Sequence, residues 1–297
     1  MTPRTKSYLM LLAVAVIWGV ASPVIKFTLA GFNPAVFLAY RFGLSTLVAL
    51  IILAIGGTHI PKNMGVFLTL LLYGFLNSVV SLGLLFFGME NTTVLETGLI
   101  TLISPLIIST VGVYFLHEHV TKREKIGMGI AILGTALTIT GPLNFSGNIL
   151  VLGYVISTVA TTLLAKNLLK KDVNAMTMTN FSFIIGFICF AIYVLLNYSS
   201  NYLINLVLST PSEYHLGVAY MAIISGTLAF YLNTRAQKSI EIGEASLFSY
   251  LYPIFSLPLA VLWLGEKLTT NSIIGGIIIA LGVVIAEIKK KRYNNNL

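Results

Sequence analysis

Hydrophobic blocks of about twenty residues recur along the whole sequence, and they constrain the fold more than any other feature. A helix needs about 20 apolar residues to cross the ~30 Å hydrocarbon core of a bilayer. Ten blocks of this length are present, at residues 7–28, 34–56, 65–88, 92–116, 124–142, 147–168, 176–198, 214–235, 243–265 and 270–288. The connections between them are too short for a soluble catalytic or nucleotide-binding domain. We therefore predict an all-α integral membrane protein with ten transmembrane helices.

Lysine and arginine are distributed unevenly between the two ends of these spans. When the N-terminus is placed inside the cell, 15 of the 18 Lys and Arg residues fall on the inner side. Because positive residues concentrate on the cytoplasmic side, both termini are predicted to be cytoplasmic in a multi-pass protein of the cell membrane. The net charge of +8 is then explained by membrane topology and does not indicate a nucleic-acid partner. The exceptions are Lys26 and Lys267 on the outer side and Arg41, about two helical turns inside the second span.

The two halves of the chain repeat one another. A shift of 148 residues aligns Glu96 with Glu244, Pro105 with Pro253 and Glu118 with Glu266 without gaps. Unrelated apolar helices would match Leu and Val by chance, but not Glu and Pro in register. The sequence therefore predicts two five-helix repeats, residues 1–142 and 143–297. Because five is odd, the second repeat would be inverted relative to the first, as in many secondary transporters with a substrate site near the midplane.

Several of these residues also carry a family resemblance. Trp18-Gly19 followed by Lys26, Arg41 in the second span and the run Leu264-Gly265-Glu266-Lys267-Leu268 are the most specific features. With them the chain resembles the drug/metabolite transporter superfamily, specifically its ten-helix EamA-type members, over nearly its whole length. His117 stands where that pattern has a glycine. The resemblance implies two EamA-like repeats and an exporter or exchanger of amino acids and other small metabolites.

Polar side chains near the middle of a span indicate where a substrate pathway runs, because they are costly in hydrocarbon unless they pair or line a cavity. Spans one, three, four, six, eight and nine carry such residues, whereas spans five and ten show mainly aliphatic residues and glycines. We expect a central cavity that excludes spans five and ten. The candidate substrate-binding residues are Trp18, Ser22, Arg41, Asn77, Ser81, Ser104, Tyr154, Thr158, Ser225, Tyr250 and Tyr252. The alternative is that Ser and Thr bond their own backbone carbonyls and that Tyr packs as core.

Arg41 has two competing interpretations. A guanidinium presents a bidentate fork that suits a carboxylate or phosphate of the substrate. A long cationic side chain at this depth is equally able to extend to the outer surface. The glycines of spans five and ten recur at seven residues, as Gly127 with Gly134 and Gly275 with Gly282, and predict close packing of these helices.

Two matched pairs of residues are candidates for hinges or gates. Pro105 and Pro253 each remove a helix hydrogen bond near the midplane, so each is either a hinge or a static kink. Glu118 and Glu266 lie at helix C-termini, where a carboxylate is disfavoured. They would gate or couple protons, or else pair with Lys122, Lys125 or Lys267 or cap the next helix.

The predicted function is a secondary carrier that exports or exchanges amino acids or related neutral or zwitterionic compounds by alternating access. The alternatives are a carrier of other metabolites, such as nucleotide-sugar or phosphorylated compounds, a passive channel, and a non-transporting membrane enzyme or partner protein. A paired-aspartate protease is excluded because Asp172 is the only aspartate. No catalytic residue, cofactor or metal is expected. The expected partners are a small-molecule substrate and the lipid bilayer, without nucleic acid, in a monomer or homodimer.

Overall fold

The computed structural model describes residues 2–55, 60–116, 122–139, 144–267 and 269–287. Within these ranges all regular secondary structure is helical. Glu118 and its neighbour His117 lie outside the described residues, as do the side chains of Lys122 and Lys125.

Each predicted span overlaps a helix or a run of consecutive helices. In the first half these are α1 (Pro3–Thr28), α2 (Pro34–Ala54), α3 (Met64–Gly74) with the π-helix η1 (Phe75–Ser81) and α4 (Leu82–Glu90), α5 (Val94–Thr101) with α6 (Ser104–Leu116), and α7 (Lys122–Ile139). In the second half they are α8 (Phe145–Lys170), α9 (Ala175–Asn197), α11 (Ser212–Ala219) with the π-helix η2 (Tyr220–Leu228) and α12 (Ala229–Ala236), α13 (Ile242–Ser246) with the 3-10 helix η3 (Leu247–Leu251) and α14 (Tyr252–Leu262), and α15 (Thr270–Glu287). A further short helix, α10 (Ser200–Ser209), lies in the longest connection.

Seven of these helices or helix runs are long and apolar enough to cross a membrane. They are Pro3–Thr28, Pro34–Ala54, Met64–Glu90, Phe145–Lys170, Ala175–Asn197, Ser212–Ala236 and Ile242–Leu262. Shorter apolar helical stretches cover Val94–Ile108 and Thr270–Ile285. The chain is thus a multi-pass helical membrane protein, while the number of ten crossings remains a prediction.

Polar side chains set several of the helix starts. Asn33 accepts a hydrogen bond from the N–H of Val36 at 3.0 Å, and Pro34 occupies the first turn of α2. Thr93 accepts one from the N–H of Glu96 at 3.0 Å at the start of α5. These caps satisfy N–H groups that have no partner inside the helix, and such groups must find partners at a membrane boundary.

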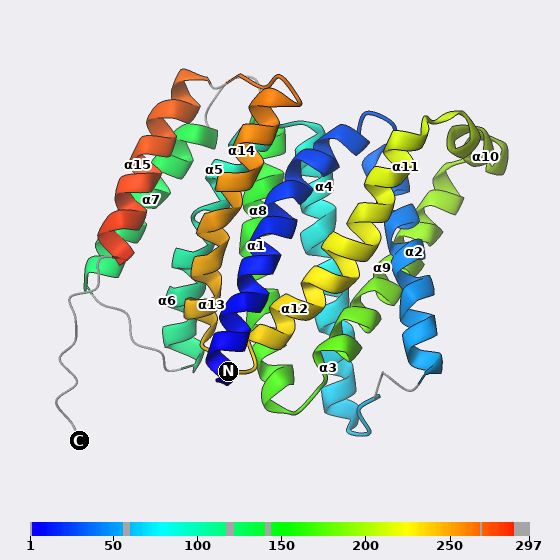
Figure 1. Cartoon of the computed structure of the whole chain (residues 1–297), viewed down its shortest axis with the longest axis horizontal. Helices are drawn as coiled ribbons and strands as arrows, with labels where there is room; N and C mark the ends of the chain where they lie inside the picture. The colour runs from blue at the N-terminus through cyan, green and yellow to red at the C-terminus, as the bar shows by residue number, and fades with distance from the viewer. Residues whose placement is uncertain (1, 56–59, 117–121, 140–143, 268, 288–297) are drawn as a thin grey trace.

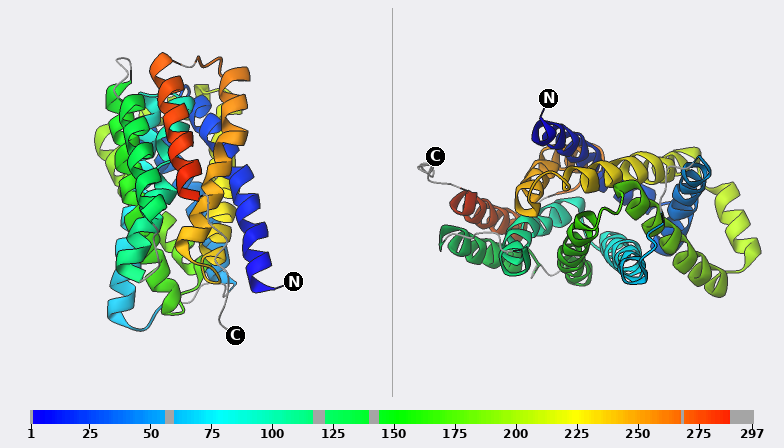
Figure 2. Two further views of the ribbon diagram at one scale, coloured as in Figure 1. Left: turned by 90° about the vertical axis from the view of Figure 1, so that its left-hand side faces the viewer. Right: turned by 90° about the horizontal axis from the view of Figure 1, so that it is seen from below.

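The helices form one elongated bundle (Figures 1 and 2). α7 and α15 pack against each other at one end, and α2 packs on α9 toward the other end near α10. A Cβ added at Gly134 would lie 2.7 Å from the carbonyl oxygen of Gly275, and one at Gly282 would lie 2.6 Å from that of Gly127. The predicted glycine-mediated packing of these two helices is confirmed, and it occurs within one chain.

The two proline-containing spans are helix runs with a break near each proline, where the sequence predicted a hinge or a static kink. α5 ends at Thr101 and α6 begins at Ser104, so that Pro105 lies in the first turn of a new helix. Likewise η3 interrupts the ninth span, and Pro253 lies in the first turn of α14. Proline lacks an N–H and clashes inside a helix but is tolerated in the first turn, so the helix restarts at the proline.

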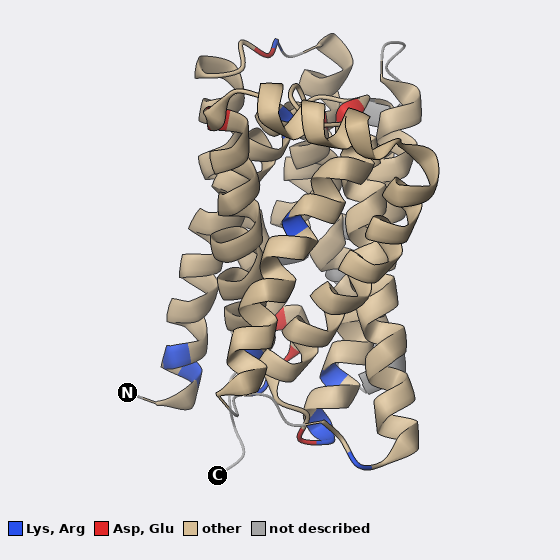
Figure 3. Ribbon diagram, turned by 90° about the vertical axis from the view of Figure 1, so that its right-hand side faces the viewer, with Lys and Arg blue, Asp and Glu red and all other residues tan. Residues whose placement is uncertain are grey.

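Two lysines bind backbone carbonyls at the ends of neighbouring helices. Lys26 Nζ donates to the carbonyl of Met89, in the last turn of α4, at 2.8 Å and to that of Thr92, beyond the end of α4, at 2.7 Å. Lys166 Nζ donates to the carbonyls of Gln237 and Ile240, both at 2.6 Å, beyond the end of α12. Figure 3 shows that most of the described Lys and Arg lie toward the end of the bundle where α1 begins.

Candidate functional site

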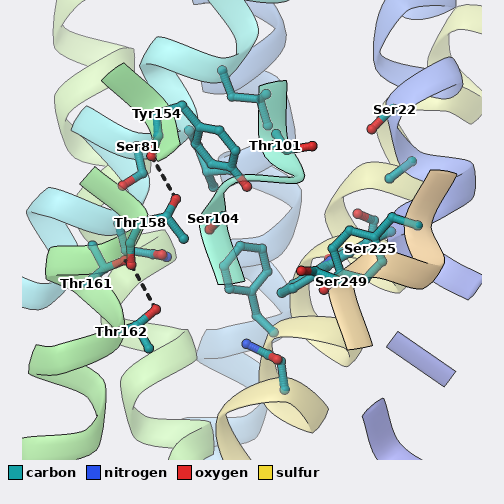
Figure 4. Close-up of a pocket in the computed structure, with 18 of the residues that line it drawn as sticks. Ser22, Ser81, Thr101, Ser104, Tyr154, Thr158, Thr161, Thr162, Ser225 and Ser249 are labelled. Carbon is teal, nitrogen blue, oxygen red and sulfur yellow. Dashed lines mark hydrogen bonds between the residues drawn. The ribbon is translucent and has the colours of Figure 1, made fainter. Parts of the chain in front are cut away.

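A cavity of about 190 Å³ lies in the bundle between the two halves of the chain. Its described lining comes from α1, α2, α3, η1, α4, α5, α6, α8, η2, α12, α13, η3 and α14, and none of it from α7 or α15. Figure 4 shows Ser81, Tyr154 and Thr158 facing Ser225 and Ser249 from opposite sides. This lining agrees with a cavity that excludes spans five and ten.

Ten of the eleven candidate binding residues line this cavity. They are Trp18, Ser22, Arg41, Asn77, Ser81, Ser104, Tyr154, Thr158, Ser225 and Tyr252. Tyr250 is not among the lining residues, although the prediction placed it there. Of the candidate hinges, Pro253 lines the cavity and Pro105 is buried outside the lining. That the ten residues bind a substrate remains a prediction.

Trp18 joins α1 to the π-helical segment η2. Its indole Nε1 donates to the carbonyl of Ser225 at 2.9 Å. Its ring meets Phe230 and Tyr252 edge-on, with centroids 5.0 and 6.0 Å apart. The indole N–H is satisfied by this bond, so Trp18 offers the cavity a rigid apolar face.

Asn77 lies in the π-helical segment η1, 148 positions before Ser225. Its carboxamide nitrogen donates to Ser182 Oγ at 2.9 Å, and Ser182 Oγ also lies 2.7 Å from Ser78 Oγ. Ser182 belongs to α9 and is fully buried. The bond therefore fixes the orientation of the amide, and the carboxamide oxygen accepts no hydrogen bond from a described residue.

The hydroxyls on α8 divide between two roles. Thr158 Oγ1 donates to the carbonyl of Tyr154 at 2.9 Å, and Thr162 Oγ1 donates to that of Thr158 at 2.8 Å (Figure 4). The proton of the Thr158 hydroxyl is thus used by its own helix, as the structural alternative foresaw. Ser157 Oγ instead lies 2.7 Å from Ser81 Oγ on η1 and links the two elements.

Arg41 is fully buried, with 1% of its surface exposed, and lines the cavity. The alternative in which it extends to the outer surface is therefore wrong. α2 packs against α9 and η2, and this packing turns the side chain into the bundle. The guanidinium carbon lies 5.4 Å from the ring centre of Phe42 and 5.3 Å from that of Phe86. Nε and Nη1 have no hydrogen-bond partner among the described residues.

Several polar lining residues escaped the sequence prediction. They are Tyr73, Thr97, Thr101, Thr161, Thr162, Asn233, Thr234, Gln237, Ser246, Ser249 and Ser256. Most lie toward the ends of their spans, where a search limited to the midplane does not look. A helical-spacing search would have found some of them, because Thr97 and Thr101 are four residues apart and share a face of α5.

Glu266 binds the start of α5 from the connection between α14 and α15. Its carboxylate oxygens accept the N–H groups of Val94 at 2.8 Å and Leu95 at 3.0 Å. Gly265, at φ +66, provides the left-handed turn that precedes it. The expectation that this residue pairs with Lys267 or caps the next helix is therefore wrong: it caps a helix of the other half.

Burial raises the pKa of Glu266, and the two N–H groups and the nearby Lys26 oppose that shift. Desolvation thus favours the protonated carboxyl of Glu266, whereas the hydrogen bonds from the two N–H groups favour its ionised form. Glu118, at the matching position of the first half, lies outside the described residues.

The profile of the EamA-like transporter family matches the chain twice, at residues 5–140 and 145–287. The uncharacterized transporter YyaM of Bacillus subtilis is 26% identical over 97% of this chain and 96% of its own length. The uncharacterized transporter YetK of the same organism is 29% identical over 70% of this chain, and that match spans 64% of YetK. A probable amino-acid metabolite efflux pump of Salmonella typhimurium is 26% identical over 95% of this chain and 94% of its own length.

A crystal structure of another protein has the same fold. It superposes with a TM-score of 0.66 over 97% of this chain and 99% of its own, at 15% sequence identity.

Proposed function

The chain belongs to the EamA-like transporter family, and from this premise we propose that it is a secondary carrier that exports or exchanges small amino-acid-like metabolites. As a member of that family it is a membrane transporter, and its relatives carry the names of transporters. The proposal adds a substrate class and a mechanism, alternating access around the central cavity.

The single observation that carries the proposal is the composition of this cavity. Its volume of about 190 Å³ lies below the range of drug-sized ligand sites and suits a small metabolite. Aromatic faces at Trp18 and Tyr252 provide an apolar wall, and Asn77 and Arg41 provide oriented polar groups. A few placed polar groups in a mainly apolar pocket are the usual composition of a small-molecule site.

We assign the substrate class to neutral or zwitterionic amino-acid-like compounds. A buried guanidinium in the cavity repels a cationic substrate. The Salmonella typhimurium relative is named an amino-acid metabolite efflux pump, which agrees with this class at 26% identity.

The architecture proposed for this carrier is ten transmembrane helices in two inverted five-helix repeats, residues 1–142 and 143–297. Matched structural features support it: η1 and η2 contain Asn77 and Ser225, and helix breaks precede Pro105 and Pro253. The clustering of the described Lys and Arg toward the end of the bundle where α1 begins supports the proposal that the termini are cytoplasmic, in the cell membrane.

Alternating access requires that the helices around the cavity move against one another. The broken segments α5–α6 and α13–η3–α14 are the proposed hinges, because a helix that restarts at a proline lacks the continuous hydrogen bonds that would hold it straight. Glu266 is the proposed gate residue of the first of these segments, since it holds the N-terminus of α5.

Efflux from liposomes tests this function. Purified protein is reconstituted into liposomes that contain radiolabelled amino acids and, separately, a labelled inert solute. A carrier releases amino acids at a rate that saturates and rises with external substrate, whereas a channel also leaks the solute. A non-transporting membrane protein releases neither label, and that result would contradict the proposal.

A further inference from the structure

The cavity contains an uncompensated buried charge. Arg41 is the one charged side chain among the described residues that line it. Two of its three nitrogens, Nε and Nη1, have no hydrogen-bond partner among the described residues, although 99% of the residue is buried. The two phenylalanine rings at 5.3 and 5.4 Å attract the cation but accept no conventional hydrogen bond.

Two hydroxyls close to Arg41 along α2 donate to backbone carbonyls of other helices. The hydroxyl of Ser45, one turn along α2, donates to the carbonyl of Ala222 at 3.0 Å. Thr46 Oγ1 donates to the carbonyl of Phe183. Gly226 of η2 lies beside the guanidinium, and a Cβ there would be 3.7 Å from Nη2. The fold therefore keeps space and unused donors around a cation in the interior.

A guanidinium stays protonated in proteins, so this charge persists in the empty cavity. A buried charge without a partner is destabilising, and a site that retains one has a reason to do so. An ionisable residue inside a membrane protein is by default a functional-site candidate, and its partner has to be named. An anion that enters the cavity would be the missing partner of Arg41.

We infer that Arg41 binds the carboxylate of the substrate, so that the cavity takes small carboxylates: zwitterionic amino acids and also monoanions that lack an α-ammonium group. The inference rests on the proposed function, because it concerns the same cavity, and it names the group that is recognised. A guanidinium and a carboxylate match as two parallel hydrogen bonds.

The charge balance of the cavity selects among anions. One guanidinium neutralises one carboxylate, whereas a phosphate monoester carries up to two charges and would need a second cation. No other described lining residue is a Lys, Arg or His. No described lining residue is an Asp or Glu either, so an ammonium group would meet only hydroxyl and amide oxygens and aromatic faces. A 2-oxo acid has no ammonium group, so it needs no acidic partner in the cavity, and it keeps the carboxylate.

Competition in proteoliposomes tests the recognised group. Alanine, leucine and phenylalanine are each compared with the corresponding 2-oxo acid, with the carboxamide and with a phosphate monoester of the same carbon skeleton. The expected result is that the 2-oxo acid inhibits uptake of the labelled amino acid at least as well as the unlabelled amino acid. The carboxamide and the phosphate monoester should be weaker by about 10-fold or more.

Arg41→Gln tests the residue, and Arg235→Gln, a change of the same type at an exposed position of α12, is the control. Arg41→Gln should weaken inhibition by carboxylates by about 10- to 150-fold without weakening inhibition by the carboxamide. The unfolding temperature of the substrate-free variant should equal or exceed that of the unmodified protein, because the change removes an unpaired charge. If Arg41→Gln does not fold, Arg41→Lys keeps the charge without the fork and should show the carboxylate loss in part.

The outcomes separate the two proposals. Equal inhibition by carboxamide and carboxylate, unaltered inhibition in Arg41→Gln, or a lowered unfolding temperature without substrate would each overturn the inference and leave the carrier function intact. Transport of none of the amino acids or 2-oxo acids by the unmodified protein would instead overturn the proposed function.

Discussion

Replacement of Asn77 by leucine examines how the cavity orients its ligand. Asn77 is 7% exposed, and its amide nitrogen is bound to Ser182 at 2.9 Å, so the amide is held in one orientation before a substrate arrives. Its carboxamide oxygen accepts no hydrogen bond from a described residue, and we propose that it binds the ligand. Leucine has nearly the same shape and no hydrogen-bonding group. Asn77→Leu therefore should reduce substrate binding by about 1 to 3 kcal/mol, which corresponds to roughly a 5- to 150-fold loss of affinity.

The same change should leave the fold intact. Ser182 keeps Ser78 as a partner at 2.7 Å after the amide is removed, so no buried hydroxyl is left without a hydrogen bond. Expression and the unfolding temperature in detergent are measured for this reason, beside the half-saturating concentration for transport. The control is Ile132→Ala on α7, where the side chain is 47% exposed outside the cavity.

The reasoning is refuted if Asn77→Leu transports with unchanged affinity. It is equally refuted if Ile132→Ala abolishes transport in a protein that still folds, because the pathway would then run elsewhere.

Four further predictions concern stability and topology. Glu266→Ala removes both acceptors at the start of α5 and should lower the free energy of unfolding by about 0.5 to 2 kcal/mol, more than Glu266→Gln, which keeps one acceptor; equal unfolding temperatures of all three proteins would contradict this. Because burial raises the pKa of Glu266, the folded state binds this proton more tightly than the unfolded state does. The contribution of this carboxyl to the free energy of unfolding should therefore increase as the pH falls through the raised pKa. Glu266→Gln should lack this pH-dependent contribution. Gly282→Ala places a Cβ 2.6 Å from backbone atoms of α7 and should lower the free energy of unfolding by about 1 to 3 kcal/mol. Gly129→Ala has open space around it and should change the free energy of unfolding little. Thermal unfolding that ranks the two variants in the opposite order would refute the close packing of α7 and α15. Reporter enzymes fused after Gly57 and after Ser200 should report opposite sides of the membrane, and detection of both on one side would contradict the proposed topology.

The sequence predicted the residues of the cavity better than the shape of the helices. Asn77, Ser104 and Ser225 were found because polar groups near the middle of a span are costly, and that rule needs no knowledge of the fold. The π-helical segments around Asn77 and Ser225 were not predicted. A π-helical turn depends on how a helix packs on its neighbours, and the residue pattern of a single helix does not report it.

Non-local contacts account for the remaining differences. The sequence placed Arg41 at the correct depth, but depth does not say which way the side chain turns, and the packing of α2 on α9 and η2 decides that. Glu266 was expected to serve a neighbour in the sequence, whereas its partners Val94 and Leu95 are more than 170 residues away. A carboxylate binds whichever free N–H groups the fold brings near, and these belonged to the other half.

Access to the cavity from both sides of the membrane is the most direct test of an alternating-access carrier. Cys189 is the only cysteine, so a Cys189→Ala background allows a single new cysteine to be introduced by Ser104→Cys, at a small residue that lines the cavity. A membrane-impermeant thiol reagent is then added from the outside or from the inside of oriented vesicles, with and without a transported amino acid. The account predicts labelling from each side and slower labelling from both when substrate is present. Labelling from one side alone under every condition, or labelling that substrate does not slow, would contradict it.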